Sequence, residues 1–203
     1  MAARLKPPFG GRRLVVDNSA FQRGAHPSVR SDWLRALEAG QLYKTPMLQF
    51  EVLYSARNAT EYSELKEELE AFHALPLTPI AVEAALMAQE ELAARHAGFH
   101  RISHADYLIA AIAGQNDLAV LHFDQDIDRI VEHSLLDFKS VWIAPAGSLN
   151  VQGSDELRGH RRALALALGQ FTGERGRDVL DRVLDLLESE LRADGLPLPR
   201  RPH

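Results

Sequence analysis

Four acidic side chains fall where this sequence predicts strand ends and helix starts. Asp17 directly follows the apolar run Leu14–Val16, and Asp124 follows a second run of the same kind. Glu51 and Asp106 lie near the starts of two expected helices. An ionised carboxylate beside an apolar run is costly unless a partner balances its charge. We therefore expect these four acids to meet around a cation.

The absence of cysteine narrows the kind of metal that such a site would hold. Without sulfur the chain has only oxygen and imidazole ligands, and three or four carboxylates suit Mg²⁺ or Mn²⁺. Such an ion lowers the pKa of a bound water, holds phosphate oxygens and stabilises the departing oxygen in an in-line displacement. The acids therefore predict hydrolysis of a phosphodiester bond.

Each acid also has a purely structural explanation. Asp17 can stabilise its own turn, Asp124 can cap the helix after it, and Glu51 can face solvent. Asp106 stands three residues after Ser103 and can complete a capping box. The functional interpretation depends on all four acids falling where one crevice can collect them.

The elements that must position these acids alternate between strand and helix. Apolar runs predict strands at 14–17, 42–45, 118–123 and 140–143, with 75–77 as a further strand or an extended link. Helical spacing and capping residues predict helices at 31–39, from 46, and at 60–72, 78–97, 103–114 and 126–132. This alternation predicts an α/β domain with a mostly parallel sheet covered on both faces, where ligands bind beyond the carboxyl ends of the strands.

Three of the helices have a recognisable start. Thr45-Pro46 and Thr78-Pro79 each combine a capping residue with a proline at the first helical position, and Thr60 is the expected cap of the helix over 60–72. Caps of this kind accept hydrogen bonds from the free N–H groups of a first turn.

The bulk composition argues against several classes of protein. The 203 residues are 46% hydrophobic, and no apolar run approaches the roughly 20 residues that cross a bilayer, so no membrane partner is expected. The first residues carry positive charge without an apolar segment behind it, so we expect a cytoplasmic protein. The net charge of -5 argues against a general basic coat for nucleic acid, although bound cations can supply positive charge locally.

Four segments share the order and spacing of a known family's motifs. They are LVVDNSA at 14–20, FEVLYSAR at 50–57, ADYLIAA at 105–111 and VLHFDQDIDRI at 120–130. Over about residues 13–144 the chain resembles the PIN-domain ribonucleases of the VapC toxin type. The resemblance implies a PIN-like three-layer α/β/α fold and a metal-dependent endoribonuclease that cuts structured RNA such as tRNA or ribosomal RNA.

The resemblance also implies roles for single residues. Asp17 and Asp106 are the expected direct Mg²⁺ ligands, and Asp124 and Asp126 are the further metal candidates, with Asp126 acting instead of Asp124 or together with it. Ser19 matches the small hydroxyl residue beside the first acid. The expected catalytic acids are Asp17, Glu51, Asp106 and Asp124. In the mechanism, Glu51 or Asp124 positions or deprotonates the attacking water, and cleavage leaves a 5′-phosphate and a 3′-hydroxyl.

The partners that the resemblance implies are an RNA substrate, a cognate antitoxin protein and a second copy of the chain in a homodimer. Two positions depart from the family pattern: His122 stands where many relatives carry Thr or Ser, and Ile127 where an aromatic residue is usual. These departures leave open the alternative of a catalytically silent PIN-like module that binds protein or RNA. A second alternative is a structure-specific DNA nuclease, because related PIN-like folds cut flaps in DNA, although such enzymes normally need more basic surface and additional helical elements.

Other charged and imidazole side chains are better explained structurally. Arg23 and Arg57 can contact phosphate, but an exposed arginine is more often a solvated surface residue. His96, His100 and His104 recur at four-residue steps, which suggests a zinc site, yet they straddle a predicted helix boundary. We assign none of these residues to the site.

Residues 149–203 are expected to form a C-terminal helical extension of unknown role, after a turn-rich link over 145–153. Helical patterns at 155–169 and 177–193 present an apolar face that has to be buried, by default against the same domain. An alternative is that the extension imitates an antitoxin and reaches the acidic crevice with one of its arginines, Arg158, Arg161, Arg162 or Arg175.

Overall fold

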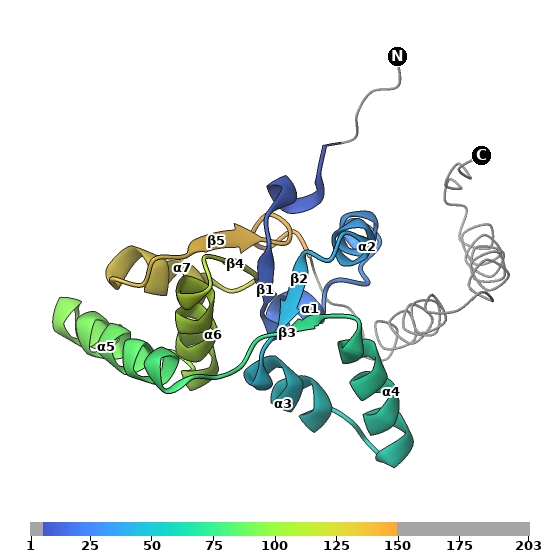
Figure 1. Ribbon diagram of the computed structural model, residues 1–203. Coiled ribbons are helices and arrows are strands. Elements are labelled where there is room, and N and C mark those ends of the chain that lie inside the picture. Colours follow the sequence, from blue (N-terminus) through green and yellow to red (C-terminus); the bar gives the residue numbers. More distant parts are fainter. Residues whose placement is uncertain (1–5, 150–203) are drawn as a thin grey trace, which may run out of the picture.

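A five-stranded parallel sheet forms the middle layer of the domain, with helices on both faces (Figure 1). The computed structural model describes residues 6–149. The strands are β1 Leu14–Val16, β2 Leu42–Lys44, β3 His73–Ala74, β4 Ala119–His122 and β5 Lys139–Trp142. They lie in the order β3-β2-β1-β4-β5, and every neighbouring pair is parallel. The predicted three-layer α/β architecture is therefore confirmed.

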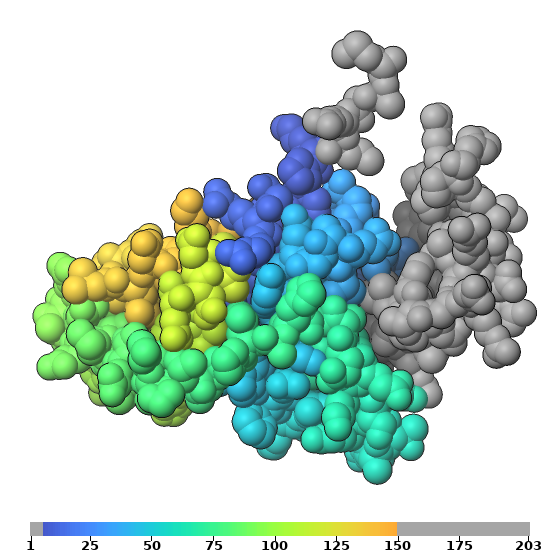
Figure 2. Space-filling model, in the orientation of Figure 1, coloured from blue at the N-terminus to red at the C-terminus, as the bar shows by residue number. Residues whose placement is uncertain are grey.

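The helices divide between the two sides of this sheet. In Figure 1, α5, α6 and α7 lie together on one side, while α1 and α2 lie on the other. The space-filling view shows the green surface of α5 adjoining the orange surface of α7 and β5 (Figure 2). The helices are η1 Pro8–Gly11, α1 Asn18–Phe21, α2 Arg30–Glu38, α3 Pro46–Tyr54, α4 Ala59–Glu70, α5 Pro79–Arg95, α6 His104–Gln115 and α7 Gln125–His133.

The central strands are buried on both faces, as their uninterrupted apolar sequence requires. In β1, Leu14 and Val16 pack into the core beside α1 and α2, whereas Val15 packs into the core beside α5, α6 and α7. Leu121 and Val120 of β4 divide between the same two cores. Because both faces are filled with side chains, a polar site has room only beyond the strand ends.

Two of the predicted helix starts are confirmed and one is wrong. The hydroxyls of Thr45 and Thr78 accept hydrogen bonds from backbone N–H groups of the first turns of α3 and α5, at 3.3 and 3.1 Å. In α4, however, Asn58 is the cap, because its side-chain oxygen accepts from the Glu61 N–H at 2.9 Å. Thr60 lies inside the first turn. Asn ranks above Thr as a capping residue, so the earlier start is the stronger one.

The third strand along the chain also starts earlier than predicted. The sequence favours 75–77, but β3 consists of His73 and Ala74, which pair with Tyr43 and Lys44 of β2. Pro76 has no N–H group to donate to a neighbouring strand, so the pairing cannot continue through it. A single backbone bond, from the Leu75 N–H to the Lys44 oxygen at 2.9 Å, ends the contact.

The packed domain continues past the predicted boundary at residue 144. Leu149 is only 5% exposed and belongs to the core beside α1 and α2. The predicted helices at 155–169 and 177–193 lie outside the described residues, so the extension stays a prediction. Between residues 6 and 149, none of the helices combines the length and apolar character that a bilayer crossing requires.

Candidate active site

Asp17 lies where β1 ends, as the sequence predicts, and the neighbouring strand fixes its position. Its backbone N–H donates to the Leu121 oxygen of β4 at 2.9 Å, and its side chain is 5% exposed. The carboxylate oxygen Oδ2 accepts from both the N–H and the hydroxyl of Ser19, the former at 2.8 Å. Asp17 thus caps the short helix α1 and is held at the carboxyl edge of the sheet.

Ser19 joins the loop after β1 to the loop after β4. While its hydroxyl donates to Asp17, its oxygen accepts from the Phe123 N–H at 2.8 Å. Phe123 directly precedes Asp124 in the chain. One hydroxyl therefore sets the spacing between two acidic residues that are far apart in the sequence.

Asp124 and Asp126 have different surroundings. Asp124 caps α7: its Oδ1 accepts from the Asp126 N–H at 2.9 Å, and the residue is exposed. The Asp126 carboxylate forms an ion pair with Arg129 at 2.8 Å. Asp124 also has a guanidinium nearby, since Arg23 interacts with it electrostatically, but only Asp126 forms a direct ion pair with an arginine.

Asp106 lies in the first turn of α6, where the other acids surround it electrostatically. Burial and then the charges of its acidic neighbours raise the pKa of the Asp106 carboxyl to about 8. Those neighbours, in order of effect, are Asp17, Asp124, Asp126 and Glu51. The four predicted catalytic acids and Asp126 therefore converge, and we call these five side chains the acidic site. Ser103 caps α6 through the Ala105 N–H at 3.2 Å.

Glu51 reaches the acidic site from the second turn of α3. Burial and the charge of Asp17 raise the pKa of the Glu51 carboxyl, while a hydrogen bond with the Asn18 side chain lowers it. The helix start at Thr45 decides which side of α3 faces Asp17, so the cap and its proline place this acid.

The ligand atoms of the acidic site are of the type that a divalent cation prefers, although the carboxylates do not lie close together. Within residues 6–149, no three Asp, Glu or His side chains already stand close enough to enclose a metal ion. All five donors are carboxylates, which Mg²⁺ and Mn²⁺ prefer. The raised pKa of Asp106 shows that these charges repel one another, and a cation would relieve that repulsion.

His122 supports the loop that carries Asp124. It is fully buried at the end of β4, and its Nδ1 accepts from the Asp124 N–H at 3.2 Å. Its Nε2 bonds to the Ser140 hydroxyl at 2.7 Å, and that hydroxyl donates to Asp128. Burial lowers the pKa of His122, which keeps the ring neutral so that Nδ1 can accept. The imidazole therefore supplies a support at a position where the resemblance leads one to expect a hydroxyl.

Arg23 lies at the edge of the acidic site, so its interpretation as a solvated surface residue is wrong. Its guanidinium donates to the Ser19 backbone oxygen at 2.8 Å and lies 4.3 Å from the ring centre of Phe123. Burial lowers the pKa of Arg23, while the charges of Asp124 and Asp17 raise it. The four-residue step from Ser19 across a helical turn is the signal that points to this position.

Tyr107 is a second polar residue near the acidic site that the sequence did not single out. It is 3% exposed, and its hydroxyl has no hydrogen-bond partner among the described residues. Burial, and then the charge of Asp126, raise its pKa. Nothing in the sequence distinguishes this tyrosine from an ordinary core residue.

The remaining alternatives weighed from the sequence lie elsewhere. Arg57 bonds to Glu61 at 3.0 Å, between α3 and α4. His96, His100 and His104 form no metal-binding group within the part of the chain that is described, so the zinc interpretation is unsupported. Ile127 is fully buried in the core beside α5, α6 and α7, where its size suits the packing.

The family of PIN domains matches residues 14–132, which span the acidic site. The chain belongs to this family. Its PIN domain is similar to two proteins of Mycobacterium tuberculosis (strain ATCC 25618 / H37Rv). Ribonuclease VapC18 is 36% identical over 66% of this chain and 97% of its own length. Ribonuclease VapC51 is 36% identical over 68% of this chain and 98% of its own length.

A solved structure shares the fold of this PIN domain. It is the crystal structure of DNA-bound VapBC from Salmonella typhimurium, in which the matching chain superposes with a TM-score of 0.53 at 14% sequence identity. The match covers 66% of this chain and 99% of that one. At such low identity the likeness concerns the fold alone, and it agrees with the parallel sheet described above.

Proposed function

We propose that this protein is a metal-dependent endoribonuclease and the toxin component of a toxin–antitoxin pair. The observation that carries the proposal is the convergence of four carboxylates on the buried Asp106, whose pKa is raised to about 8 by burial first and then by those charges. The convergence occurs at the carboxyl edge of a PIN-domain sheet, and two relatives that are each 36% identical to this chain are named ribonucleases. Clustered acids with perturbed pKa values are typical of functional sites.

The side chains of the acidic site divide the work by their surroundings. Asp17 and Asp106 are the proposed direct ligands of Mg²⁺ or Mn²⁺, and Asp124 completes the metal site in preference to the arginine-paired Asp126. The metal, when bound, supplies a more acidic water and positive charge for the phosphate oxygens. Glu51, whose raised pKa makes it a better proton acceptor than an ordinary glutamate, is the proposed general base.

Arg23 is the proposed contact for the phosphate of the substrate. Its guanidinium is held over Phe123 and interacts electrostatically with Asp124 and Asp17. A fixed cation beside the metal ligands suits a phosphodiester, because two sources of positive charge then flank the reacting phosphorus.

The proposed partners follow from the names of the relatives. A VapC-type toxin is expected to have an antitoxin encoded with it, to act on structured RNA, and to work as a homodimer in the cytoplasm. The VapBC structure from Salmonella typhimurium is an example of a related fold in complex with its partner.

Cleavage of total RNA by the purified protein tests the function directly. Cuts should appear with Mg²⁺, vanish with EDTA and vanish in Asp106→Asn, and sequencing of fragment ends should find 5′-phosphates. Asp117→Asn is the matched control. Asp117 is exposed, precedes β4 at the opposite edge of the sheet, and has a positive φ that asparagine tolerates.

Two outcomes would contradict the proposal. Cleavage that survives in Asp106→Asn at wild-type rates would assign the activity to a contaminant. No cleavage in any condition, after removal of any bound antitoxin and with the fold intact, would favour a PIN-like module that binds RNA or protein without cutting.

A further inference from the structure

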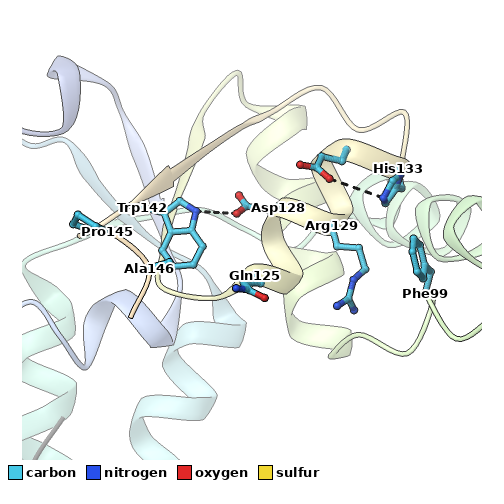
Figure 3. A pocket seen from close by; sticks show the side chains of 9 residues that line it. Phe99, Gln125, Asp128, Arg129, His133, Trp142, Pro145 and Ala146 are labelled. Atoms are coloured by element: carbon cyan, nitrogen blue, oxygen red, sulfur yellow. Dashed lines mark hydrogen bonds and ion pairs between the residues drawn. The ribbon is translucent and has the colours of Figure 1, made fainter. Parts of the chain in front are cut away.

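An open hollow lies beside the acidic site, between α7 and the end of β5 (Figure 3). Its volume is about 580 Å³, within the range of small-molecule sites. The hollow begins at Gln125, which lies between Asp124 and Asp126 in the chain, and continues along α7 past Arg129. None of the five acids lines the hollow, but Arg129 does, and its ion pair with Asp126 at 2.8 Å joins the hollow to the acidic site.

Two aromatic rings line opposite ends of this hollow. Figure 3 shows Trp142 at one end and Phe99 at the other, with Gln125 and Arg129 between them. Trp142 is fixed in place, because its indole N–H donates to Asp128 at 2.8 Å and its ring packs edge-on against Phe123 at 5.5 Å. A rigid, partly exposed aromatic ring is a good stacking surface for a flat ligand.

The polar groups of the hollow suit a flat neutral ligand better than a bare phosphate. The carboxylates of Asp128 and Glu132 line it together with the guanidinium of Arg129, so positive charge does not dominate. The Gln125 amide offers both donors and an acceptor, and no described residue bonds to it. Such a combination of an aromatic ring and an amide is typical of sites that read a nucleobase.

Arg129 connects the hollow to the acidic site. One end of its guanidinium pairs with Asp126 at 2.8 Å, and its central carbon lies 5.7 Å from the ring centre of Phe99. A nucleotide matches this arrangement of an acidic site beside an aromatic hollow, because its charged phosphate and its flat base are separated by one sugar. Its phosphate would face the acids while its base entered the hollow.

We propose that this hollow binds one unpaired nucleobase of the RNA, in a nucleotide next to the bond that is cut. The inference rests on the proposed ribonuclease function and adds to it a site for one base beside the bond that is cut. Bases inside a duplex are stacked and paired, so they cannot enter a pocket of this kind.

The fluorescence of Trp142 measures base binding without any cleavage. The chain has only two tryptophans, and Trp33 is 2% exposed inside an aromatic cluster with Phe21 and Phe72. Trp33→Phe therefore leaves Trp142 as the sole reporter, and the wild-type chain serves as a second reporter if that variant is unstable. We expect saturable quenching by nucleoside 5′-monophosphates, in the full-length protein with EDTA, at concentrations around 1 mM.

Three comparisons distinguish recognition of the base from recognition of the phosphate and from nonspecific quenching. Ribose 5-phosphate has the sugar and phosphate without a base and should not quench. Phe99→Leu and Gln125→Ala should each weaken nucleotide affinity roughly tenfold. Tyr62→Leu removes an exposed aromatic ring from α4, outside the hollow, and should leave affinity unchanged.

Each other outcome overturns the inference in a recognisable way. Equal quenching by ribose 5-phosphate would show phosphate recognition, and no quenching at any concentration tested would remove the base site. Wild-type affinity in both Phe99→Leu and Gln125→Ala would place binding elsewhere. RNA cleavage without quenching would support the proposed function and refute the base site. Quenching without RNA cleavage would support the base site and refute the proposed function.

Discussion

Asp106 is the side chain that bears most of the electrostatic cost of placing the acids together in the folded protein. Its pKa of about 8 in the folded protein lies far above its ordinary value of 3.8. Between those two values the folded protein holds a proton that the unfolded chain releases, so this residue stabilises the fold less and less as the pH rises from about 4 to 8. An asparagine at this position has no carboxyl group to titrate, so its contribution to stability does not change with pH.

Asp106→Asn should therefore stabilise the metal-free protein, and more so at higher pH. We expect the free energies of unfolding of variant and wild type to be similar near pH 4. By pH 8 the variant should be more stable, by on the order of 5 kcal/mol for a pKa change of about four units, and its Tm should be higher. Thermal unfolding with EDTA at several pH values measures this. Asp117→Asn should show no such trend, and a pH-independent difference for Asp106→Asn would contradict the electrostatic explanation.

Ser19 acts through the residues that it connects. Ser19→Ala removes the hydroxyl that donates to Asp17 and accepts from the Phe123 N–H. Loss of a group that orients a metal ligand typically lowers activity or metal affinity about 10- to 100-fold. We expect a decrease of that size in RNA cleavage and a higher requirement for Mg²⁺. Ser63→Ala, which removes an exposed hydroxyl on α4, is the control, and equal activity of the two variants would refute the role.

At the scale of elements, the start of α4 separates two nearby capping candidates. Asn58→Ala should lower the free energy of unfolding by about 1 kcal/mol, because the Glu61 N–H loses its acceptor. Thr60→Ala should change it by no more than a few tenths, since Thr60 is not the cap and alanine favours helix. Urea denaturation compares the two. A larger loss in Thr60→Ala would mean that the helix starts later in solution.

The same example shows what local sequence can predict. The ends of β1 and β4 and the proline-marked helix starts follow from patterns within a few residues, and the structure places them as expected. The catalytic roles of the four acids stay a prediction. The choice between Asn58 and Thr60 was also open to local sequence, because Asn is the stronger capping residue and the structure uses it. The positions of Arg23 and Ser140 beside the site depend on contacts between α1, β4 and β5, so they appear only after the sheet is assembled.

On the scale of the whole molecule, the domain boundary extends to Leu149. This side chain is 5% exposed in the core beside α1 and α2, so Leu149→Ala in the full chain should cost about 2–4 kcal/mol of stability. Leu135→Ala provides the control, because Leu135 is 84% exposed. Chemical denaturation of both variants checks the expectation. A loss below about 0.5 kcal/mol for Leu149→Ala would place the boundary before it.

Because β1 pairs with β4, a growing chain can complete its acidic site only late in translation. β1 leaves the ribosome early, but its partner β4 follows only after α6, near the end of the domain. Until then Asp17 has no Asp124 beside it, and Ser19 has no Phe123 N–H to accept. A nascent or prematurely terminated chain that ends before β4 therefore carries Asp17, Glu51 and Asp106 without Asp124, and its acidic site is incomplete. The cell that makes this protein meets a working nuclease only once translation of the domain is almost complete.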